Sequence, residues 1–123
     1  MKIRLHIWIV FVVVLLGILP VSAYDFQVDG IYYNINGEEV TVTNETGESN
    51  SNSYSGDVVI PSSVSYEGKS YSVTSIGEYA FQNCSHVTSV MIPETVVSIG
   101  DFAFSVCTSL TKMELPALLQ SIG

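Results

Sequence analysis

The chain has 123 residues, of which 12 are acidic and four are basic, so its formal net charge is −8 at pH 7. A strongly acidic surface repels phosphate groups, which argues against nucleic acids and anionic lipid surfaces as partners. The length supports one domain, and two cysteines are too few for a fold that disulfides hold together.

Residues 1–23 have the features of a secretory signal peptide. Lys2 and Arg4 precede an uncharged apolar run from Ile7 to Leu19, and small side chains suited to a signal peptidase follow it. The run is shorter than the roughly 20 apolar residues that a membrane-spanning helix needs. We therefore predict a secreted or cell-surface protein that starts near Tyr24 and has no membrane span. Two lysines then remain against 12 acidic residues, a net charge of −10.

Residues 24–44 predict a β-hairpin or a three-stranded meander. Asp29-Gly30 and Asn36-Gly37 favour turns with positive φ, and β-branched stretches lie beside them. We expect this hairpin to cap the first coil of the repeats that follow, because the ends of repeat arrays need cover. The alternative is a binding element that displays Tyr32 and Tyr33.

A loop and an irregular repeat come next. Residues 45–57 are rich in Ser, Asn and Gly and nearly free of apolar side chains, which predicts a mobile loop. Residues 58–77 match the later repeats at both ends but hold nine extra residues between them. The centre of this insertion, Glu67-Gly68, predicts a hairpin that bulges from the first coil.

The second half of the chain repeats with an offset of 23 residues. IGEYAFQNCSHVTSVMIPETVVS begins at Ile76, and IGDFAFSVCTSLTKMELPALLQS begins at Ile99; the two are identical at 8 of 23 positions. A period of about 20 to 29 residues is typical of leucine-rich repeats. In each unit alternate apolar residues predict a short strand with one buried face, and the proline that follows ends it. We predict a mainly β solenoid over residues 58–123, an array of about 23-residue coils that is incomplete at its C-terminus.

The repeat pattern I-G-x-x-A-F-x-x-C-x-x-L-x-x-V-x-I-P resembles the BspA-like, or Treponema-type, leucine-rich repeat. The matching residues are Ile76, Gly77, Ala80, Phe81, Cys84, Val87, Val90, Ile92 and Pro93, and in the next unit Ile99, Gly100, Ala103, Phe104, Cys107, Leu110, Met113, Leu115 and Pro116. The resemblance implies exported or surface proteins of bacteria, many of which bind proteins of a host or a neighbouring cell.

Cys84 and Cys107 occupy the same place in successive coils. Neighbouring strands lie about 4.8 Å apart, within the range of Cα separations that a disulfide allows. A bridge is one interpretation. A ladder of buried free thiols is the other, and the resemblance favours it, because the family pattern carries cysteine there as a packing residue.

The chemistry of an enzyme has no support in the sequence. His86 is the only histidine outside the signal segment, and it occupies a variable repeat position typical of a surface residue. No catalytic triad, zinc spacing or phosphate-binding loop is present. A hydrolase with paired carboxylates is the remaining enzymatic alternative, which the scattered acidic residues do not favour. We predict that the chain is not an enzyme and needs no cofactor or metal.

The outward side chains of the strand row form the predicted contact face of a binding module. Val59, Met91 and Glu114 are expected at the strand centres, with Ser89 and Lys112 just before them. Solenoids use such rows as extended binding surfaces, so the predicted function is protein–protein interaction or adhesion with a host or neighbouring-cell protein. The competing interpretation is that these side chains are merely solvated.

The alternative function is structural. The chain stops at Gly123, two residues into a new coil, which is the expectation for a truncated fragment of a longer repeat protein with no activity of its own. An uncapped last coil would expose Leu115, Leu118, Leu119 and Ile122, and self-association through them is the expected consequence.

Overall fold

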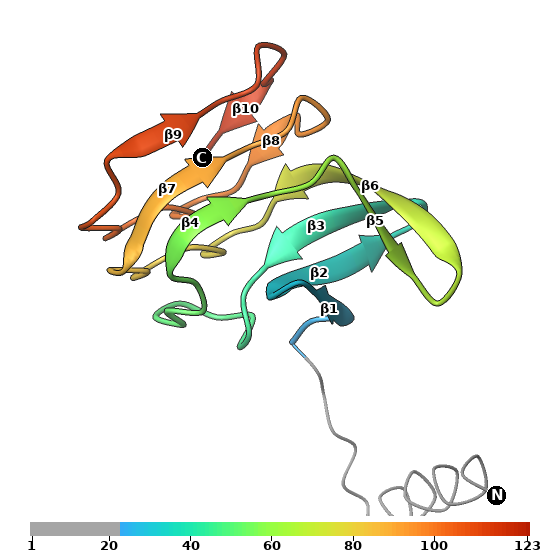
Figure 1. The fold of residues 1–123 in the computed structure, drawn as a ribbon, viewed down its shortest axis with the longest axis horizontal. Coiled ribbons are helices and arrows are strands. Elements are labelled where there is room, and N and C mark those ends of the chain that lie inside the picture. The colour runs from blue at the N-terminus through green and yellow to red at the C-terminus, as the bar shows by residue number, and fades with distance from the viewer. Residues whose placement is uncertain (1–22) are drawn as a thin grey trace, which may run out of the picture.

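The computed structural model describes residues 23–123, so the predicted signal peptide lies, but for Ala23, outside the described residues. Ten strands and no helix occur in this part of the chain, which confirms the predicted β class. The strands form two sheets (Figure 1).

The large sheet has seven strands. Six of them follow the order β1-β2-β3-β6-β8-β10, and the seventh, β5, pairs with β6 outside this order. Its strands are β1 (Phe26–Val28), β2 (Ile31–Asn36), β3 (Glu39–Thr43), β5 (Ser63–Tyr66), β6 (Lys69–Ile76), β8 (Ser98–Ile99) and β10 (Ser121–Ile122). β1, β2 and β3 form an antiparallel meander, whereas β3, β6, β8 and β10 are parallel. The meander and the repeats therefore share one continuous sheet.

Two tight turns shape the antiparallel parts of this sheet. Asp29 and Gly30 have φ values of 50° and 81° between β1 and β2, and Glu67 and Gly68 have values of 50° and 77° between β5 and β6. Successive residues with positive φ are typical of the two-residue hairpin turn that matches strand twist. The hairpin predicted from Glu67-Gly68 is present, with Tyr66 opposite Lys69.

The small sheet contains β4 (Gly56–Val59), β7 (Val87–Met91) and β9 (Lys112–Glu114), all parallel and in that order. Its ladder pairs Ser89 with Lys112, and the large sheet pairs Ser75 with Ser98 and Ser98 with Ser121, so partners are 23 positions apart in the sequence. Equivalent residues of successive units thus lie side by side. Between β4 and β7 the offset is larger, because the β5–β6 hairpin intervenes.

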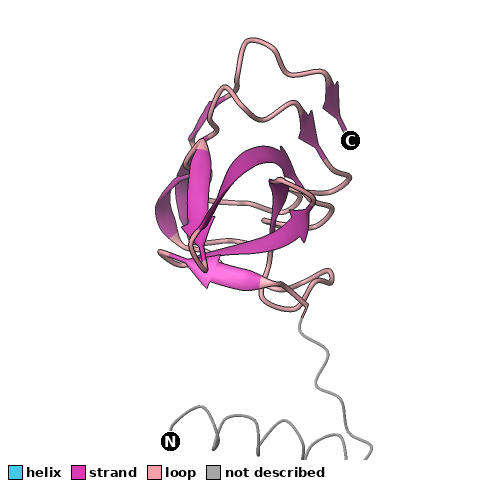
Figure 2. Ribbon diagram, turned by 90° about the vertical axis from the view of Figure 1, so that its right-hand side faces the viewer, coloured by secondary structure: helices cyan, strands magenta, loops and turns pink. Residues whose placement is uncertain are grey.

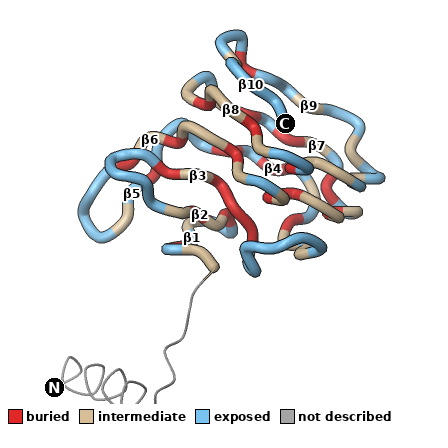
Figure 3. The backbone as a smooth tube through the Cα atoms, turned by 180° about the vertical axis from the view of Figure 1, so that it is seen from behind, coloured by how far each residue is buried: buried red, intermediate tan, exposed pale blue. Residues whose placement is uncertain are grey.

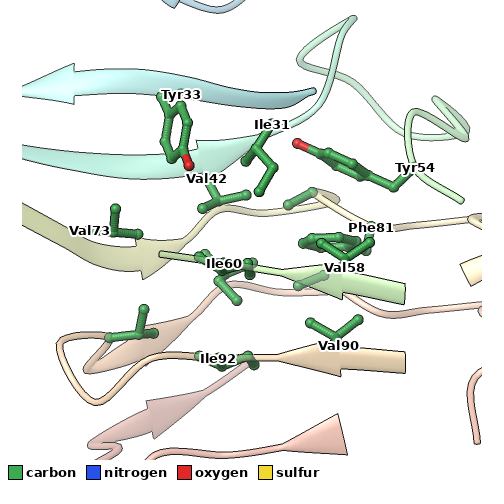
Figure 4. Packing of buried hydrophobic residues seen from close by; sticks show 14 of the residues in the cluster. Ile31, Tyr33, Val42, Tyr54, Val58, Ile60, Val73, Phe81, Val90 and Ile92 are labelled. Carbon is green, nitrogen blue, oxygen red and sulfur yellow. The ribbon is translucent and has the colours of Figure 1, made fainter. Parts of the chain in front are cut away.

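The hydrophobic core draws on both sheets and on the connections between them. A second view shows that strands and their connecting loops make up the described part of the molecule (Figure 2). Val58 and Val90 of the small sheet, Val42 and Val73 of the large sheet, and Phe81 of a connection are all buried (Figure 4). Apolar area removed from water contributes about 25 cal/mol per Å², so this layer is the main source of stability.

Three aromatic rings run through the core. Phe81 stacks on Phe104 with ring centroids 4.9 Å apart and on Tyr54 with centroids 4.4 Å apart. Phe81, the middle ring of the three, is fully buried. Stacked aromatic pairs add about 0.5–1.5 kcal/mol beyond the area that they bury.

The segment expected to be a Ser- and Asn-rich loop differs from its prediction in two respects. Gly56 and Asp57 belong to β4, and Tyr54 is a core residue with 6% of its surface exposed. Asn44, immediately before the segment, is fully buried, and its Nδ2 donates hydrogen bonds to Glu48 O and Tyr79 O, both at 2.9 Å. The average composition of the segment is polar and gave no sign that the ring of Tyr54 is buried, although this ring decides how the segment packs.

The last repeat unit is more exposed than the one before it (Figure 3). Leu115 and Ile122 have 48% and 61% of their surface exposed, whereas the equivalent residues Ile92 and Ile99 have 5% each. Leu118 is 73% exposed, and Leu119 is partly buried. Among the described residues no strand lies beyond β9 or β10. The side chains of this unit therefore have neighbours on one side only, which explains their exposure.

Candidate functional site

The five predicted contact residues come together on the small sheet. Val59, Met91 and Glu114 are successive partners in its ladder and form one row across the three strands. Ser89 and Lys112 form a second row two residues earlier. They all share one face, because side chains two residues apart on a strand point to the same side, while Val58 and Val90 point into the core.

The apolar row is open to solvent. Val59 and Met91 have 61% and 45% of their surface exposed, although each lies next to a buried valine in its own strand. Single exposed apolar side chains are ordinary on protein surfaces. Two of them paired across neighbouring strands form a small apolar patch, which Glu114 bounds at one end.

Asp57 is the third residue of the polar row, and the sequence-based prediction missed it. It is the ladder partner of Ser89 and lies on the same face as Val59. Its Oδ1 accepts hydrogen bonds from Ser89 Oγ at 2.7 Å and from Thr88 Oγ1 at 2.9 Å. These hydrogen bonds, with a smaller contribution from the charge of Lys112, hold the pKa of the Asp57 carboxyl below its usual range.

Lys112 and Glu114 bound the other side of the face. The Nζ of Lys112 lies 3.6 Å from Oε1 of Glu114, and both side chains are largely exposed. Exposed ion pairs contribute about 0–1 kcal/mol, so this pair leaves both charges available to a partner. The face therefore combines an apolar patch with Asp57, Lys112 and Glu114.

A shallow groove of about 210 Å³ follows this face. It is lined by Asp57, Val58, Val59, Ser89, Val90, Met91, Lys112 and Glu114, so it contains all five residues singled out from the sequence. The sequence predicted Val59, Met91 and Glu114 at the strand centres, but they lie at the C-terminal ends of their strands. Pro61 and Pro93 follow closely, and the strands end before them.

The two thiols are apart from this face. Both cysteines are free; Cys84 is buried, and the Sγ of Cys107 donates a hydrogen bond to Phe81 O at 3.0 Å. Burial raises the pKa of each thiol, which keeps the reactive thiolate form scarce. The structure agrees with the packing interpretation.

Other chemical groups do not converge on one place. His86 is exposed and its Nδ1 lies 3.1 Å from Ser85 Oγ, in keeping with the surface position expected from the sequence. Over residues 23–123 no group of three or more His, Cys, Asp or Glu side chains could hold a metal ion. None of these residues forms a helix long and apolar enough to cross a membrane.

The parallel ladders, the strand-ending prolines and the exposed row define a strand-rich repeat protein. Residues 62–123 match the BspA type leucine rich repeat region (6 copies). The chain belongs to the BspA-type leucine-rich repeat family, which confirms the resemblance seen in the sequence.

Solved structures of bacterial leucine-rich repeat proteins are similar to the chain. A leucine-rich repeat protein from Bacteroides ovatus has a TM-score of 0.66 and 37% identity, over 78% of this chain and 24% of that one. A leucine rich cell surface protein from Faecalibacterium prausnitzii has a TM-score of 0.65 and 30% identity, over 87% and 27%. The T. pallidum leucine rich repeat protein has a TM-score of 0.60 and 27% identity, over 80% and 42%.

The chain thus spans about a quarter of the length of the first two of these proteins. No curated protein matches its sequence.

Proposed function

We propose that the chain is a protein-binding module of the bacterial cell surface or of a secreted protein, and that the outer face of the small sheet is its contact surface. The observation that carries the proposal is the exposed pairing of Val59 with Met91 across β4 and β7, inside a groove bounded by charged side chains. Apolar anchors surrounded by polar groups are typical of protein interfaces.

The family and the proposed architecture support a binding role. We infer a solenoid of about 23-residue coils, since both parallel ladders pair residues with that offset. Solenoids present a row of strands as one extended surface. In this arrangement residues 24–44 cap the first coil, and residues 58–123 form the repeats.

Export is the second part of the proposal. Residues 1–23 have the charge, apolar run and small-residue exit of a signal peptide, and the similar F. prausnitzii protein is described as a cell surface protein. The partner is then a protein exposed on a host cell or a neighbouring cell. Apolar burial favours this contact, since fully burying one such side chain contributes about 1.5–3 kcal/mol.

The test compares a face variant with a matched control. Met91→Glu places a charge in the apolar patch, whereas Ile35→Glu makes the same change at an exposed position of β2, outside the small sheet. The purified protein and both variants are applied to an array of purified host surface proteins. We expect Met91→Glu to weaken each specific interaction by about tenfold or more, as for an interface anchor, and Ile35→Glu to leave it unchanged. Equal binding by both variants would remove the small sheet as the contact face.

A further inference from the structure

β4 is an edge strand, and some of its main-chain N–H and C=O groups have no hydrogen-bond partner in a neighbouring strand. β7 pairs with it on one side, and no described strand lies on the other. The N–H groups of Gly56 and Ile60 donate to His86 O and Met91 O at 2.8 and 3.0 Å, so the even-numbered residues face β7. Main-chain groups alternate in direction along a strand. The N–H and C=O groups of Asp57 and Val59 therefore face the open edge.

A second groove runs along this edge. It measures about 270 Å³ and is lined by Asp29, Gly30, Ile31, Ser53, Tyr54, Ser55, Asp57, Val58 and Val59. The turn between β1 and β2 and the end of the loop before β4 thus border the same space as the open edge. A strand added to a sheet lies about 4.8 Å from its neighbour, which places an added strand within this groove.

The usual protection of an exposed edge is weak here. Proteins shield edge strands with charged side chains, prolines or bulges. The carboxylate of Asp57 is held by the hydroxyls of Thr88 and Ser89, which belong to β7 on the opposite side of β4. The one register irregularity near β4 lies between Gly56 and Asp57, before the residues whose groups face outward. The edge at Asp57 and Val59 is therefore left open.

Charge indicates the chemistry of an occupant. Asp29 and Asp57 both line the groove, and no basic side chain does. The two lysines of the described residues lie elsewhere: Lys69 is 5.2 Å from the ring centroid of Tyr71, and Lys112 is paired with Glu114. A cationic occupant would thus meet two carboxylates, of which Asp57 also interacts with the charge of Lys112 on the outer face.

We propose that β4 binds an extended basic polypeptide segment as an additional strand. Main-chain hydrogen bonds to Asp57 and Val59 hold the segment. Lysine or arginine side chains on it are attracted to Asp29, which lines the groove, and at longer range to Asp57, whose carboxylate is bonded to hydroxyls of β7. Strand addition of this kind gives affinity through the main chain and specificity through alternate side chains. The inference goes beyond the proposed contact face, because it rests on the edge of β4 and not on the outward side chains of three strands.

The test uses a fluorescent peptide of four Lys-Thr repeats as the probe, with binding followed by anisotropy. Val59→Pro removes the outward N–H group, and proline is tolerated at an edge whose N–H faces away from the ladder. Val59→Ala is the matched control, because it shortens the same side chain and keeps the N–H. We expect Val59→Pro to weaken binding by about fivefold or more, which corresponds to the loss of one hydrogen bond. We expect Val59→Ala to change binding by less than about 2.5-fold.

Two further measurements keep the test decisive if Val59→Pro fails to fold. A probe with alternate amides N-methylated should lose its binding to the unchanged protein, since one edge of the peptide then has no donors. Asp29→Asn combined with Asp57→Asn should weaken binding, and the probe of four Glu-Thr repeats should not bind. Glu38→Gln, in the exposed turn between β2 and β3, is the control for net charge.

The outcomes separate this inference from the proposed contact face. Loss of probe binding in Val59→Pro but not in Met91→Glu supports strand addition, whatever the protein array shows. Loss in Met91→Glu without any effect of N-methylation places the probe on the face and overturns the edge site. Absence of probe binding also overturns it. So does a concentration-dependent dimer in sedimentation that Val59→Pro abolishes, because the occupant is then a second copy of the chain.

Discussion

At the scale of single residues, two buried tyrosines differ in how their hydroxyl groups are satisfied. Tyr54 donates a hydrogen bond to Thr43 O and accepts one from the N–H of Tyr32 at 3.1 Å. The hydroxyl of Tyr33 is buried, and no hydrogen bond from the described residues reaches it. Burial, with a smaller contribution from Asp29, raises the pKa of Tyr33 to about 12. Figure 4 shows both tyrosines, with Ile31 between them in that view.

This difference predicts opposite results for the same substitution. Tyr54→Phe leaves the C=O of Thr43 and the N–H of Tyr32 without their partner, so we expect a loss of about 1–3 kcal/mol in the free energy of unfolding. Tyr33→Phe removes a hydroxyl whose burial costs energy, so we expect no loss or a small gain. Urea denaturation of both variants measures the difference. Equal losses would show that hydrogen bonding of the hydroxyl is not what distinguishes the two sites.

At the scale of elements, the turns after β6 and β8 approach each other closely. A Cβ atom on Gly100 would lie 2.6 Å from the N of Glu78 and 2.9 Å from the C of Gly77. Both neighbours are main-chain atoms of the preceding unit, which cannot move aside as a side chain can. Glycine at this position is therefore required by the stacking of successive units. A Cβ atom on Gly77 would likewise lie close to a main-chain atom, 3.1 Å from the O of Val42.

We expect Gly100→Ala to destabilise the protein by about 1–3 kcal/mol through this clash, the usual cost of overpacking. Gly37→Ala is the control. Gly37 has a φ of 67° and open space around its Cβ position, so its substitution carries only the strain of the left-handed region, about 1–2 kcal/mol. The clash in Gly100→Ala should also loosen the parallel pairing of Ile76 with Ile99, which amide hydrogen exchange would detect. Unchanged exchange at these two amides would contradict the proposed close contact between units.

At the scale of the whole molecule, acidic residues outnumber basic ones by three to one. Lys112 and Glu114 form the only ion pair among residues 23–123, so most of the negative charge is not balanced by a close cation. Like charges repel across the folded surface and weaken its stability. The repulsion is screened as the Debye length falls from about 30 Å at 0.01 M salt to about 8 Å at 0.15 M.

The midpoint of thermal unfolding should therefore rise when sodium chloride is increased over this range. Calorimetry at constant pH measures the shift. Lys112→Gln, which removes one of the few cations, should enlarge the salt effect, whereas Glu48→Gln should reduce it. A midpoint that falls with salt would mean that local charge attraction, not net repulsion, dominates the electrostatic energy.

The sequence by itself determined the repeat, its turns and the row of exposed strand residues that we propose as the contact face. The offset of 23 residues predicted which residues pair in the ladders, because stacked units place equivalent positions side by side. Glu67-Gly68 predicted its hairpin, since local backbone preference decides a two-residue turn. Aligning residues 58–61 with residues 90–93 across the nine inserted residues places Asp57 opposite Ser89, so the sequence could have identified this third residue of the polar row.

Only the tertiary structure decided how the chain outside the regular repeat joins it. Tyr54 lies in a polar segment, and nothing local to it indicates that its ring stacks on Phe81. The parallel pairing of β3 with β6 and the open edge of β4 likewise depend on contacts between residues far apart in the sequence. A periodic pattern repeats the same local environment, so it can be read from residues alone. Where the period breaks, packing against distant residues determines the conformation, and the sequence holds no local signal of that packing.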